Sequence, residues 1–181
     1  MNKRPPTFGY RLLAPILLAV FKFYYSPRVF GKGNIPSKGA VVVCSNHKHV
    51  LDQCLAALAT RRPINYMAKS EYFKGSFAWF FKFTGCICVN RNGHDDDAKS
   101  SANAVLVNGG ALGIFPEGKR YRSGPMREVK TGCALIAIKT GADILPVSIY
   151  KEGKPHPFRK ATLRFGETIK NSDFAAYFRS L

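Results

Sequence analysis

Short apolar runs alternate with segments of helical apolar spacing between residues 40 and 165. Residues 40–44 form a continuous apolar run after the turn residues 36–39, a pattern typical of a buried parallel strand. Similar patterns predict strands at residues 65–68, 86–89, 111–115, 144–149 and 161–165, and helices at residues 50–58, 71–83, 95–107 and 133–139. Strands that alternate with helices predict an α/β fold, a single layered domain with a largely parallel sheet flanked by helices.

The N-terminal residues carry a different pattern. Residues 12–21 are ten consecutive apolar positions, which fall short of the ~20 that a membrane-spanning helix needs. A signal peptide is one alternative, but bulky residues at 23–27 stand where cleavage requires small side chains. The second alternative is that these residues form an ordinary core helix. We expect residues 1–35 to be a basic amphipathic membrane-anchoring segment whose helix lies in the bilayer interface, and residues 36–181 to form the domain.

Composition and charge narrow the classes of partner. A content of 46% hydrophobic residues, with 14 Phe and 8 Tyr, excludes a disordered chain. The 28 Lys and Arg residues against 11 Asp and Glu give a net charge of +17, which attracts nucleic acid, anionic membranes or phosphorylated substrates. Residues 1–51 contain no Asp or Glu, so their basic residues favour binding to an anionic membrane. Each contributes roughly 1 kcal/mol of attraction to anionic lipid. The first acid, Asp52, is expected to be ionised in such positive surroundings.

The cysteines indicate a reducing compartment rather than a disulfide framework. The chain has 5 Cys residues, an odd count without regular spacing, and most lie in apolar runs. Cys86 and Cys88 flank an isoleucine in a predicted buried strand, and a zinc site needs about four ligands. We therefore interpret them as core residues and expect no metal.

His47 and Asp52 follow the first predicted strand directly. In one continuous helix, side chains five positions apart are rotated by about 140° and do not meet. If His47 lies in a loop and Asp52 in the first turns of the next helix, the carboxylate accepts a hydrogen bond from one imidazole nitrogen and leaves the other as a base. We expect this pair to be catalytic; a structural histidine, or His49 as the base, is the alternative.

A glycine-containing basic cluster at residues 116–124 follows another predicted strand. Lys119 and Arg120 stand next to Gly118, so the cluster offers cations and backbone N–H groups to a phosphate, at the strand end where ligands of α/β sheets bind. Glu117 suits either contact with a hydroxyl group or support of an arginine. A solvated loop is the alternative for the cluster as a whole.

Four blocks occur in order between residues 40 and 150. They are His47-x4-Asp52, Gly85-x5-Arg91, Phe115-Pro116-Glu117-Gly118 and Leu145-Pro146-Val147. Their order and spacing resemble the glycerolipid acyltransferase superfamily, and most closely its 1-acyl-sn-glycerol-3-phosphate (lysophosphatidic acid) acyltransferase branch. The resemblance implies that residues 36–181 are an acyltransferase domain.

The resemblance also implies a reaction and roles for residues. A fatty acyl group would move from an acyl thioester to the free hydroxyl of 1-acyl-sn-glycerol-3-phosphate, giving phosphatidic acid in phospholipid biosynthesis without a covalent enzyme intermediate. His47 would be the general base, and Asp52 would orient it. With the basic cluster, the expected substrate-binding residues are Arg91, Glu117, Gly118, Lys119, Arg120 and Lys130. The family often carries Thr-Arg-Ser after Glu-Gly, whereas residues 119–123 are Lys-Arg-Tyr-Arg-Ser. Glycerol-3-phosphate or another lysophospholipid therefore stays open as the acceptor.

The same resemblance implies the partners. Acyl-CoA or acyl carrier protein would be the donor substrate, with no cofactor, and the protein would work on the cytoplasmic face of the cell membrane as a peripheral or monotopic protein. Its expected partners are an anionic membrane surface and lysophosphatidic acid, and not nucleic acid. Two other classes compete: a basic nucleic-acid-binding module, which a pI near 10.0 fits although no recognition motif is visible, and a membrane-bound interaction protein with a vestigial His47–Asp52 pair.

Overall fold

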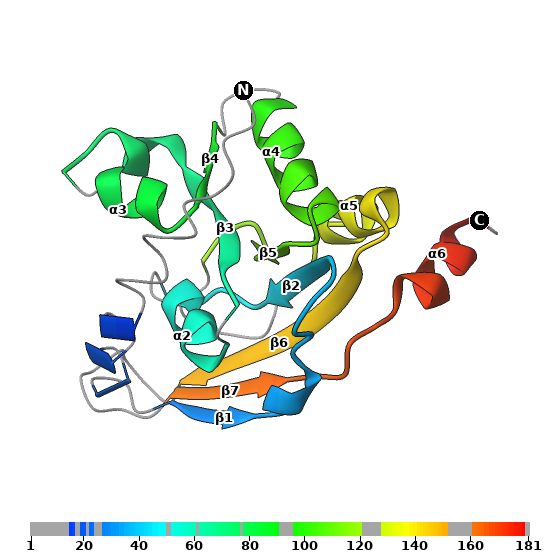
Figure 1. The fold of residues 1–181 in the computed structure, drawn as a ribbon, viewed down its shortest axis with the longest axis horizontal. Helices are drawn as coiled ribbons and strands as arrows, with labels where there is room; N and C mark the ends of the chain where they lie inside the picture. The colour runs from blue at the N-terminus through cyan, green and yellow to red at the C-terminus, as the bar shows by residue number, and fades with distance from the viewer. Residues whose placement is uncertain are drawn as a thin grey trace.

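A seven-stranded sheet organises the part of the chain that the structure describes (Figure 1). The computed structural model describes residues 15–16, 19–20, 22–23, 27–49, 52–60, 62–76, 78–90, 96–120, 128–151 and 161–179. The strands are β1 (Arg28–Phe30), β2 (Val41–Ser45), β3 (Ile64–Lys69), β4 (Ile87–Val89), β5 (Ala111–Ile114), β6 (Asp143–Lys151) and β7 (Ala161–Phe165). The helices are α2 (Asp52–Ala59), α3 (Ala78–Phe83), α4 (Asp96–Val107), α5 (Gly132–Thr140) and α6 (Asn171–Arg179), with 3-10 turns η1 (Lys32–Asn34) and η2 (Ser70–Phe73).

The sheet is largely parallel, as the sequence predicted. Its strand order is β1-β7-β6-β2-β5-β3-β4. Strand β2 pairs in parallel with both β5 and β6, and β3 pairs in parallel with β5 and β4. The β6–β7 pair is antiparallel, whereas β1 pairs with β7 in parallel. The carboxyl ends of β2, β3, β5 and β6 consequently share one edge of the sheet, which we call the carboxyl edge.

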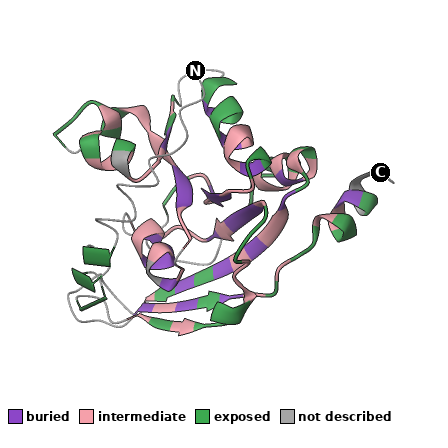
Figure 2. Ribbon diagram, in the orientation of Figure 1, coloured by how far each residue is buried: buried purple, intermediate pink, exposed green. Residues whose placement is uncertain are grey.

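Different helices cover the two faces of the sheet. Along β2, Val41 and Val43 pack with Leu55 and Ala56 of α2, whereas Val42 belongs to the cluster that α4 and α5 form on the other face. This alternation follows from the two-residue period of a strand, and all three valines are buried because both faces are covered. Figure 2 shows the buried residues concentrated in the central strands. The predicted α/β fold class is confirmed.

Three features differ from the sequence predictions. The helix expected at residues 71–83 is wrong, because the chain forms η2, then a turn through Gly75, then the short helix α3. The prediction relied on the apolar spacing of the aromatic residues and overlooked that Lys-Gly-Ser at residues 74–76 favours a turn. Arg28–Phe30, which the sequence placed in the N-terminal segment, is strand β1 of the sheet. The sheet therefore begins upstream of the boundary expected at residues 35–36; a strand of three residues is too short to show periodicity. Helix α6 was not predicted.

The predicted interfacial helix falls mostly outside the described residues. Within the apolar stretch and its end, residues 15–16, 19–20 and 22–23 are helical, and the side chains of Ile16, Val20 and Phe23 are exposed. No helix within the described ranges has the length and apolar character that crossing a bilayer requires. Membrane anchoring by residues 1–35 stays a prediction.

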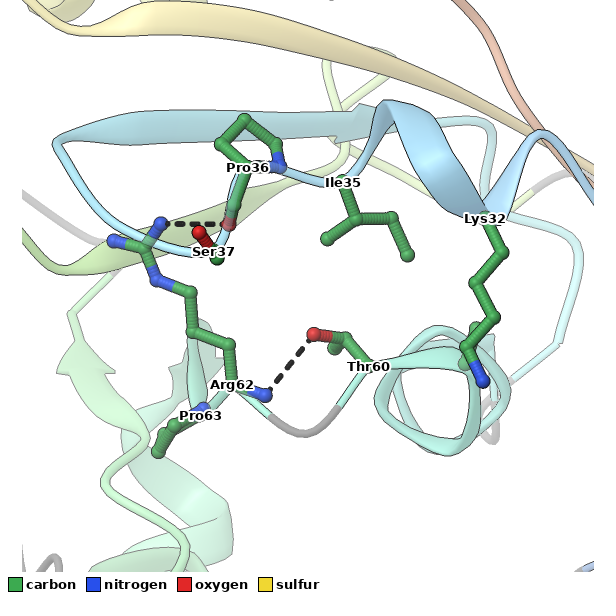
Figure 3. Close-up of a pocket in the computed structure, with 8 residues that line it drawn as sticks. Lys32, Ile35, Pro36, Ser37, Thr60, Arg62 and Pro63 are labelled. Atoms are coloured by element: carbon green, nitrogen blue, oxygen red, sulfur yellow. Dashed lines mark hydrogen bonds between the residues drawn. The ribbon is translucent and has the colours of Figure 1, made fainter.

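Arg62 joins three segments at the opposite edge of the sheet, where β2, β3 and β5 begin. Its guanidinium donates hydrogen bonds to the carbonyl oxygens of Pro36, at 3.1 Å, and of Gly39 and Gly109. Figure 3 shows the bond to Pro36 and the bond from the Arg62 backbone N–H to Thr60 Oγ1. The segments before β2 and β3, but not the one before β5, line a cavity of about 450 Å³. This clamp fixes the starts of three parallel strands and, through them, the positions of their carboxyl ends.

Replacing Arg62 by Met should lower the free energy of unfolding by about 2–3 kcal/mol. A hydrogen bond to a charged group contributes about 1.5–3 kcal/mol, and three carbonyl oxygens lose their donor, although water replaces part of the loss at this half-buried site. Urea unfolding measures the change. The matched control is Lys38→Met, which removes an exposed cation from the loop that carries Pro36 and Gly39 and should change stability by less than about 0.5 kcal/mol. Equal unfolding midpoints for the two variants would contradict the clamp.

Candidate active site

The residues of the candidate site come from loops at the carboxyl edge of the sheet. His47 follows β2, Phe115 and Glu117 follow β5, and Lys151 is the last residue of β6. Asp52 is the first residue of α2 and lies close in the chain to the end of β2. Ligands of open α/β sheets bind outside the carboxyl ends of the strands, so this edge is the expected location of a site.

His47 and Asp52 meet, as the sequence predicted from their spacing. The Nδ1 atom of His47 lies 3.2 Å from Oδ2 of Asp52. The loop folds back over the start of α2, so that the backbone N–H groups of Lys48 and His49 donate to the same oxygen at 2.7 Å and 2.6 Å. The backbone N–H of Asp52 donates in return to the carbonyl oxygen of His49 at 3.2 Å. These bonds fix the imidazole in the loop and leave Nε2 as the nitrogen available for proton transfer.

Lys151 is a partner of Asp52 that sequence reasoning missed. Its Nζ lies 3.2 Å from Asp52 Oδ1, across 99 residues of chain. The side chain of Asp52 is fully buried, and that of Lys151 is 14% exposed. The sequence offered only one signal, a lysine just beyond a predicted strand, and such lysines usually point into solvent. The ammonium and the Nδ1 atom of His47 thus contact different oxygens of one carboxylate.

These contacts decide the charge of Asp52. Burial alone raises the pKa of this carboxyl group, because the charged form loses its hydration. The hydrogen bond from His47, the backbone N–H groups of His49 and Lys48, and the charge of Lys151 oppose that effect and lower the pKa of Asp52 below its ordinary value. Asp52 is therefore ionised at neutral pH and accepts hydrogen bonds only. The Nδ1 atom of His47 must then carry the proton, so Nε2 is the unprotonated nitrogen of the neutral ring.

A stack of rings supports the imidazole from one side. The ring of His47 lies on Phe115 with centroids 3.9 Å apart and an angle of 14° between planes, and Phe115 lies on Tyr66 at 5.4 Å. Tyr66 stands opposite Gly113 in the β3–β5 pair. A Cβ atom on Gly113 would come within 2.3 Å of the Tyr66 ring, so only glycine leaves room for it. The packing between β3 and β5 thus fixes the plane of the imidazole.

Asn46 ties the loop to β6. Its Nδ2 donates to the carbonyl oxygen of Ile149 at 2.9 Å, and its Oδ1 accepts from the backbone N–H of Ile149 at 2.7 Å. The side chain continues the pairing between β2 and β6 by one position. The bonds hold the start of the 46–49 loop against the strand that carries Lys151.

Glu117 contacts the backbone of His47. Its Oε1 accepts a hydrogen bond from the His47 N–H at 2.9 Å, and the residue is 7% exposed. The sequence assigned Glu117 to the substrate-binding residues. The described contact of Glu117 supports the loop, and its assignment to the substrate-binding residues stays a prediction. The described contacts thus join the first and third sequence blocks through the backbone of His47.

The basic residues gather around the turn after Glu117. Gly118 has a φ of +68°, a left-handed conformation that favours glycine, and a Cβ atom there would lie 3.4 Å from Cε of Lys130. The backbone N–H of Lys130 donates to the carbonyl oxygen of Pro116 at 3.0 Å. Lys119 and Arg120 follow with exposed side chains. The predicted residues Gly118, Lys119, Arg120 and Lys130 are thus brought together, whereas Arg91 lies outside the described residues.

The cysteines do not take part in the contact of His47 with Asp52, and two of them, Cys44 and Cys133, form a hydrogen bond with each other. All five cysteines are free. Within the described parts of the chain, no three His, Cys, Asp or Glu side chains are grouped closely enough to hold a metal ion. The cavity beside Arg62 lies where β2 and β3 begin, at the opposite edge from His47.

Comparisons with known proteins agree with the sequence blocks. Residues 26–150 match the family model described as Acyltransferase. A 1-acyl-sn-glycerol-3-phosphate acyltransferase from Borreliella burgdorferi is 35% identical over 125 residues, covering 67% of this chain and 50% of that protein. Another from Chlamydomonas reinhardtii is 27% identical over 149 residues, covering 80% of this chain and 45% of that protein. The chain thus spans about half the length of these curated relatives.

A solved structure extends the likeness to the fold. The crystal structure of the 1-acyl-sn-glycerophosphate (LPA) acyltransferase PlsC from Thermotoga maritima superposes with a TM-score of 0.69 at 26% identity, covering 97% of this chain and 73% of that one. The family model covers well over half of this chain, including the His47–Asp52 block and the Phe115–Gly118 block that meet at the carboxyl edge. By sequence and by fold, the chain belongs to the acyltransferase family.

Proposed function

We propose that this chain transfers a fatty acyl group from an acyl thioester to the free hydroxyl of 1-acyl-sn-glycerol-3-phosphate and forms phosphatidic acid. The observation that carries the proposal is the contact of His47 Nδ1 with the buried, ionised carboxylate of Asp52, which leaves Nε2 as a base. The names of the Borreliella burgdorferi and Thermotoga maritima relatives support this acceptor. The donor, acyl-CoA or acyl carrier protein, is proposed on chemical grounds, because a thioester is already activated for acyl transfer.

The proposed reaction is a direct transfer. Nε2 of His47 takes the proton of the acceptor hydroxyl while its oxygen attacks the thioester carbonyl carbon. The carbon–sulfur bond of the tetrahedral intermediate then breaks, the ester forms, and the thiolate leaves with the proton that the imidazole returns. Asp52 keeps the ring in the required tautomer and stabilises the positive charge that the ring carries between the two steps. No metal or cofactor enters this scheme.

The basic residues after β5 are proposed to bind the acceptor phosphate. Lys119, Arg120 and Lys130 are exposed and close to the turn that Glu117 connects to His47. Charge-assisted hydrogen bonds to phosphate are strong, and a phosphate fixed here would bring the neighbouring glycerol hydroxyl toward the imidazole. We include Arg91 in this group because of its sequence block. Glycerol-3-phosphate and other lysophospholipids are the acceptors to compare in the assay.

We also propose that the protein works at the anionic, cytoplasmic face of the cell membrane. The net charge of +17, the five free cysteines and a lipid acceptor that stays in the bilayer support this location. The basic amphipathic segment at residues 1–35 is proposed to contribute to the attachment. The charge excess is explained by lipid and phosphate, so nucleic acid is not needed as a partner.

Replacing His47 by Ala should reduce turnover about 10²–10⁴-fold, because the reaction loses its general base. The measurement is thiol release from an acyl thioester that depends on the lysophosphatidic acceptor. His49→Ala is the matched control, since His49 lies in the same loop and the variant keeps the backbone N–H and carbonyl groups that contact Asp52. His49→Ala should therefore keep most of the activity. The opposite ranking of the two variants would contradict the assignment.

Replacing Asp52 by Asn should lower stability most at neutral pH. Because the folded-state pKa of Asp52 is lowered, its ionised form stabilises the protein above the unfolded pKa of about 3.9, and this contribution is lost as pH falls through the folded pKa. The free energy of unfolding of the variant should be lower than that of the wild type by about 2 kcal/mol or more at pH 7, where the Asn variant also removes a negative charge next to Lys151. Urea unfolding measures the difference in free energy of unfolding between wild type and variant from pH 7 down to pH 3. This difference should decrease as the pH falls, and a constant difference would contradict the lowered pKa of Asp52.

Lys130 and Glu117 should behave differently when replaced. Lys130→Ala should lower kcat/KM for the lysophosphatidic acceptor by about tenfold or more, because a bond to a charged phosphate contributes about 1.5–3 kcal/mol, while slow hydrolysis of the thioester by water is unchanged.

Glu117→Ala should slow both acyl transfer and thioester hydrolysis, because it releases the backbone of His47. Glu117→Gln keeps an oxygen acceptor and should restore most of the activity. Selective loss of acceptor use in Glu117→Ala would instead make Glu117 a substrate contact.

A further inference from the structure

The segment between β3 and β4 is rich in aromatic side chains and lies at one end of the sheet. It consists of η2, the turn after it and α3, within residues 70–83, and we call it the aromatic hairpin. It leaves β3 at the carboxyl edge, the edge that also carries His47. Figure 1 shows it beside β4, the last strand on that side, and away from α5 and α6. Its position is therefore peripheral in the fold but adjacent to the edge that carries the site.

Aromatic contacts within the hairpin hold its two halves together. Phe81 of α3 stacks on Tyr72 of η2, with centroids 5.1 Å apart and planes 11° apart, and contacts Phe73 at 5.8 Å. Phe80 packs edge-to-face against Phe81 at 5.7 Å. A helix of six residues is not stable alone in water, so these contacts hold α3 in place. The hairpin is thus a packed unit that presents a defined outer surface.

That outer surface combines a large aromatic side chain with cations. Trp79 is 57% exposed and Tyr72 is 38% exposed. Lys82 is exposed three positions after Trp79, on the same side of α3, and Lys74 is exposed in the turn. Residues 70–83 contain one acid, Glu71, against these two lysines. An exposed tryptophan next to lysines matches the composition of segments that lie at the headgroup level of a bilayer.

We propose that the aromatic hairpin docks on an anionic lipid bilayer, with Trp79 at the headgroup level and Lys74 and Lys82 against anionic headgroups. Trp and Tyr favour this depth because one end of the ring is apolar and the other polar. Lysines near an anionic surface strengthen binding by about fivefold each. A second copy of the chain fits less well, because a two-fold interface would bring the same lysines to face one another. This surface is separate from residues 1–35, which the sequence assigned to the membrane.

The proposal gives the hairpin a function in the proposed reaction, on which this consequence rests. The hairpin begins at the carboxyl end of β3, which shares its edge with the carboxyl end of β2. Docking there would turn the edge that carries His47 toward the bilayer. A lysophospholipid would then reach the imidazole with its acyl chain still in lipid, and the positively charged turn after β5 would meet the phosphate. The hairpin would therefore set the orientation of the protein on the membrane.

The experiment uses Trp79 as its own probe, because it is the only Trp in the chain. The full chain is mixed with vesicles of phosphatidylcholine that contain phosphatidylglycerol, and then with the same vesicles made from brominated lipid. Docking predicts a shift of the tryptophan emission to shorter wavelength and quenching by bromine. Vesicles of phosphatidylcholine alone should give a smaller response. Residues 1–35 contain no Trp, so their binding alone would change neither signal.

Two matched variants test the electrostatic part. Lys82→Glu should weaken vesicle binding, measured by Trp79 emission, by about fivefold or more. Lys139→Glu is the control, because Lys139 is also an exposed lysine in the last turn of a helix, but on α5. It makes the same change of net charge and should have a clearly smaller effect. On a short-chain soluble acceptor, both variants should keep wild-type rates, whereas with acceptor in vesicles Lys82→Glu should raise KM about fivefold.

Three results would overturn the proposal. They are absence of vesicle binding, binding with unshifted and unquenched Trp79, and equal effects of Lys82→Glu and Lys139→Glu. A shift of Trp79 emission that grows with protein concentration without vesicles would assign the surface to a second copy instead. The fluorescence measurements need no substrate, so they are independent of the proposed reaction. A wild-type protein that docks through Trp79 but transfers no acyl group would refute the function and leave the docking surface intact.

Discussion

The site depends on satisfying one buried carboxylate. An ionised Asp52 inside the protein costs several kcal/mol unless donors surround it, and removing one donor leaves the charge uncompensated. The donors are the ring of His47, the backbone N–H groups of Lys48 and His49, and the ammonium of Lys151. Three of the four come from consecutive residues, so their bonds to the carboxylate also fix the path of the loop. The position of the imidazole is thus a consequence of how the charge of Asp52 is satisfied.

The parallel sheet makes this arrangement possible, because it brings distant loops to one edge. Strand β2 carries the His47 loop, and its neighbours β5 and β6 carry Phe115 and Lys151. The sheet also fixes the orientation of the imidazole ring. Gly113 has no Cβ atom, so Tyr66 lies across β5 and supports Phe115, on which His47 stacks. Arg62 clamps the beginnings of β2, β3 and β5. The same bonds therefore fix the strands relative to one another and the positions of the loops that follow them.

The sequence predicted what depends on local pattern and missed what depends on register. Most central strands and helices have strong periodicity, and the fold class follows from their alternation. The contact of His47 with Asp52 was predictable because five residues and one loop separate them. The contacts of Lys151 with Asp52, Asn46 with Ile149 and Glu117 with His47 join residues 99, 103 and 70 positions apart. Only strand order and register bring those pairs together, and the hydrophobic pattern predicts neither of them. The wrong helix at residues 71–83 has a different cause, a glycine turn within an aromatic run.

Two buried acids, Asp52 and Glu117, matter more in this protein because the rest of it is so basic. A net charge of +17 gives the protein a positive field, and the two buried acids place negative charge close to His47. Asp52 contacts the ring and Glu117 contacts the backbone N–H of the same residue, so both negative charges lie within hydrogen-bond distance of His47. Lys151 offsets part of the charge of Asp52 from the far side of the carboxylate. The negative charge of Asp52 therefore acts mainly on the groups that contact it, the imidazole among them. The two acids therefore act locally on the loop that carries His47, whereas the excess of basic residues determines the field over the rest of the protein.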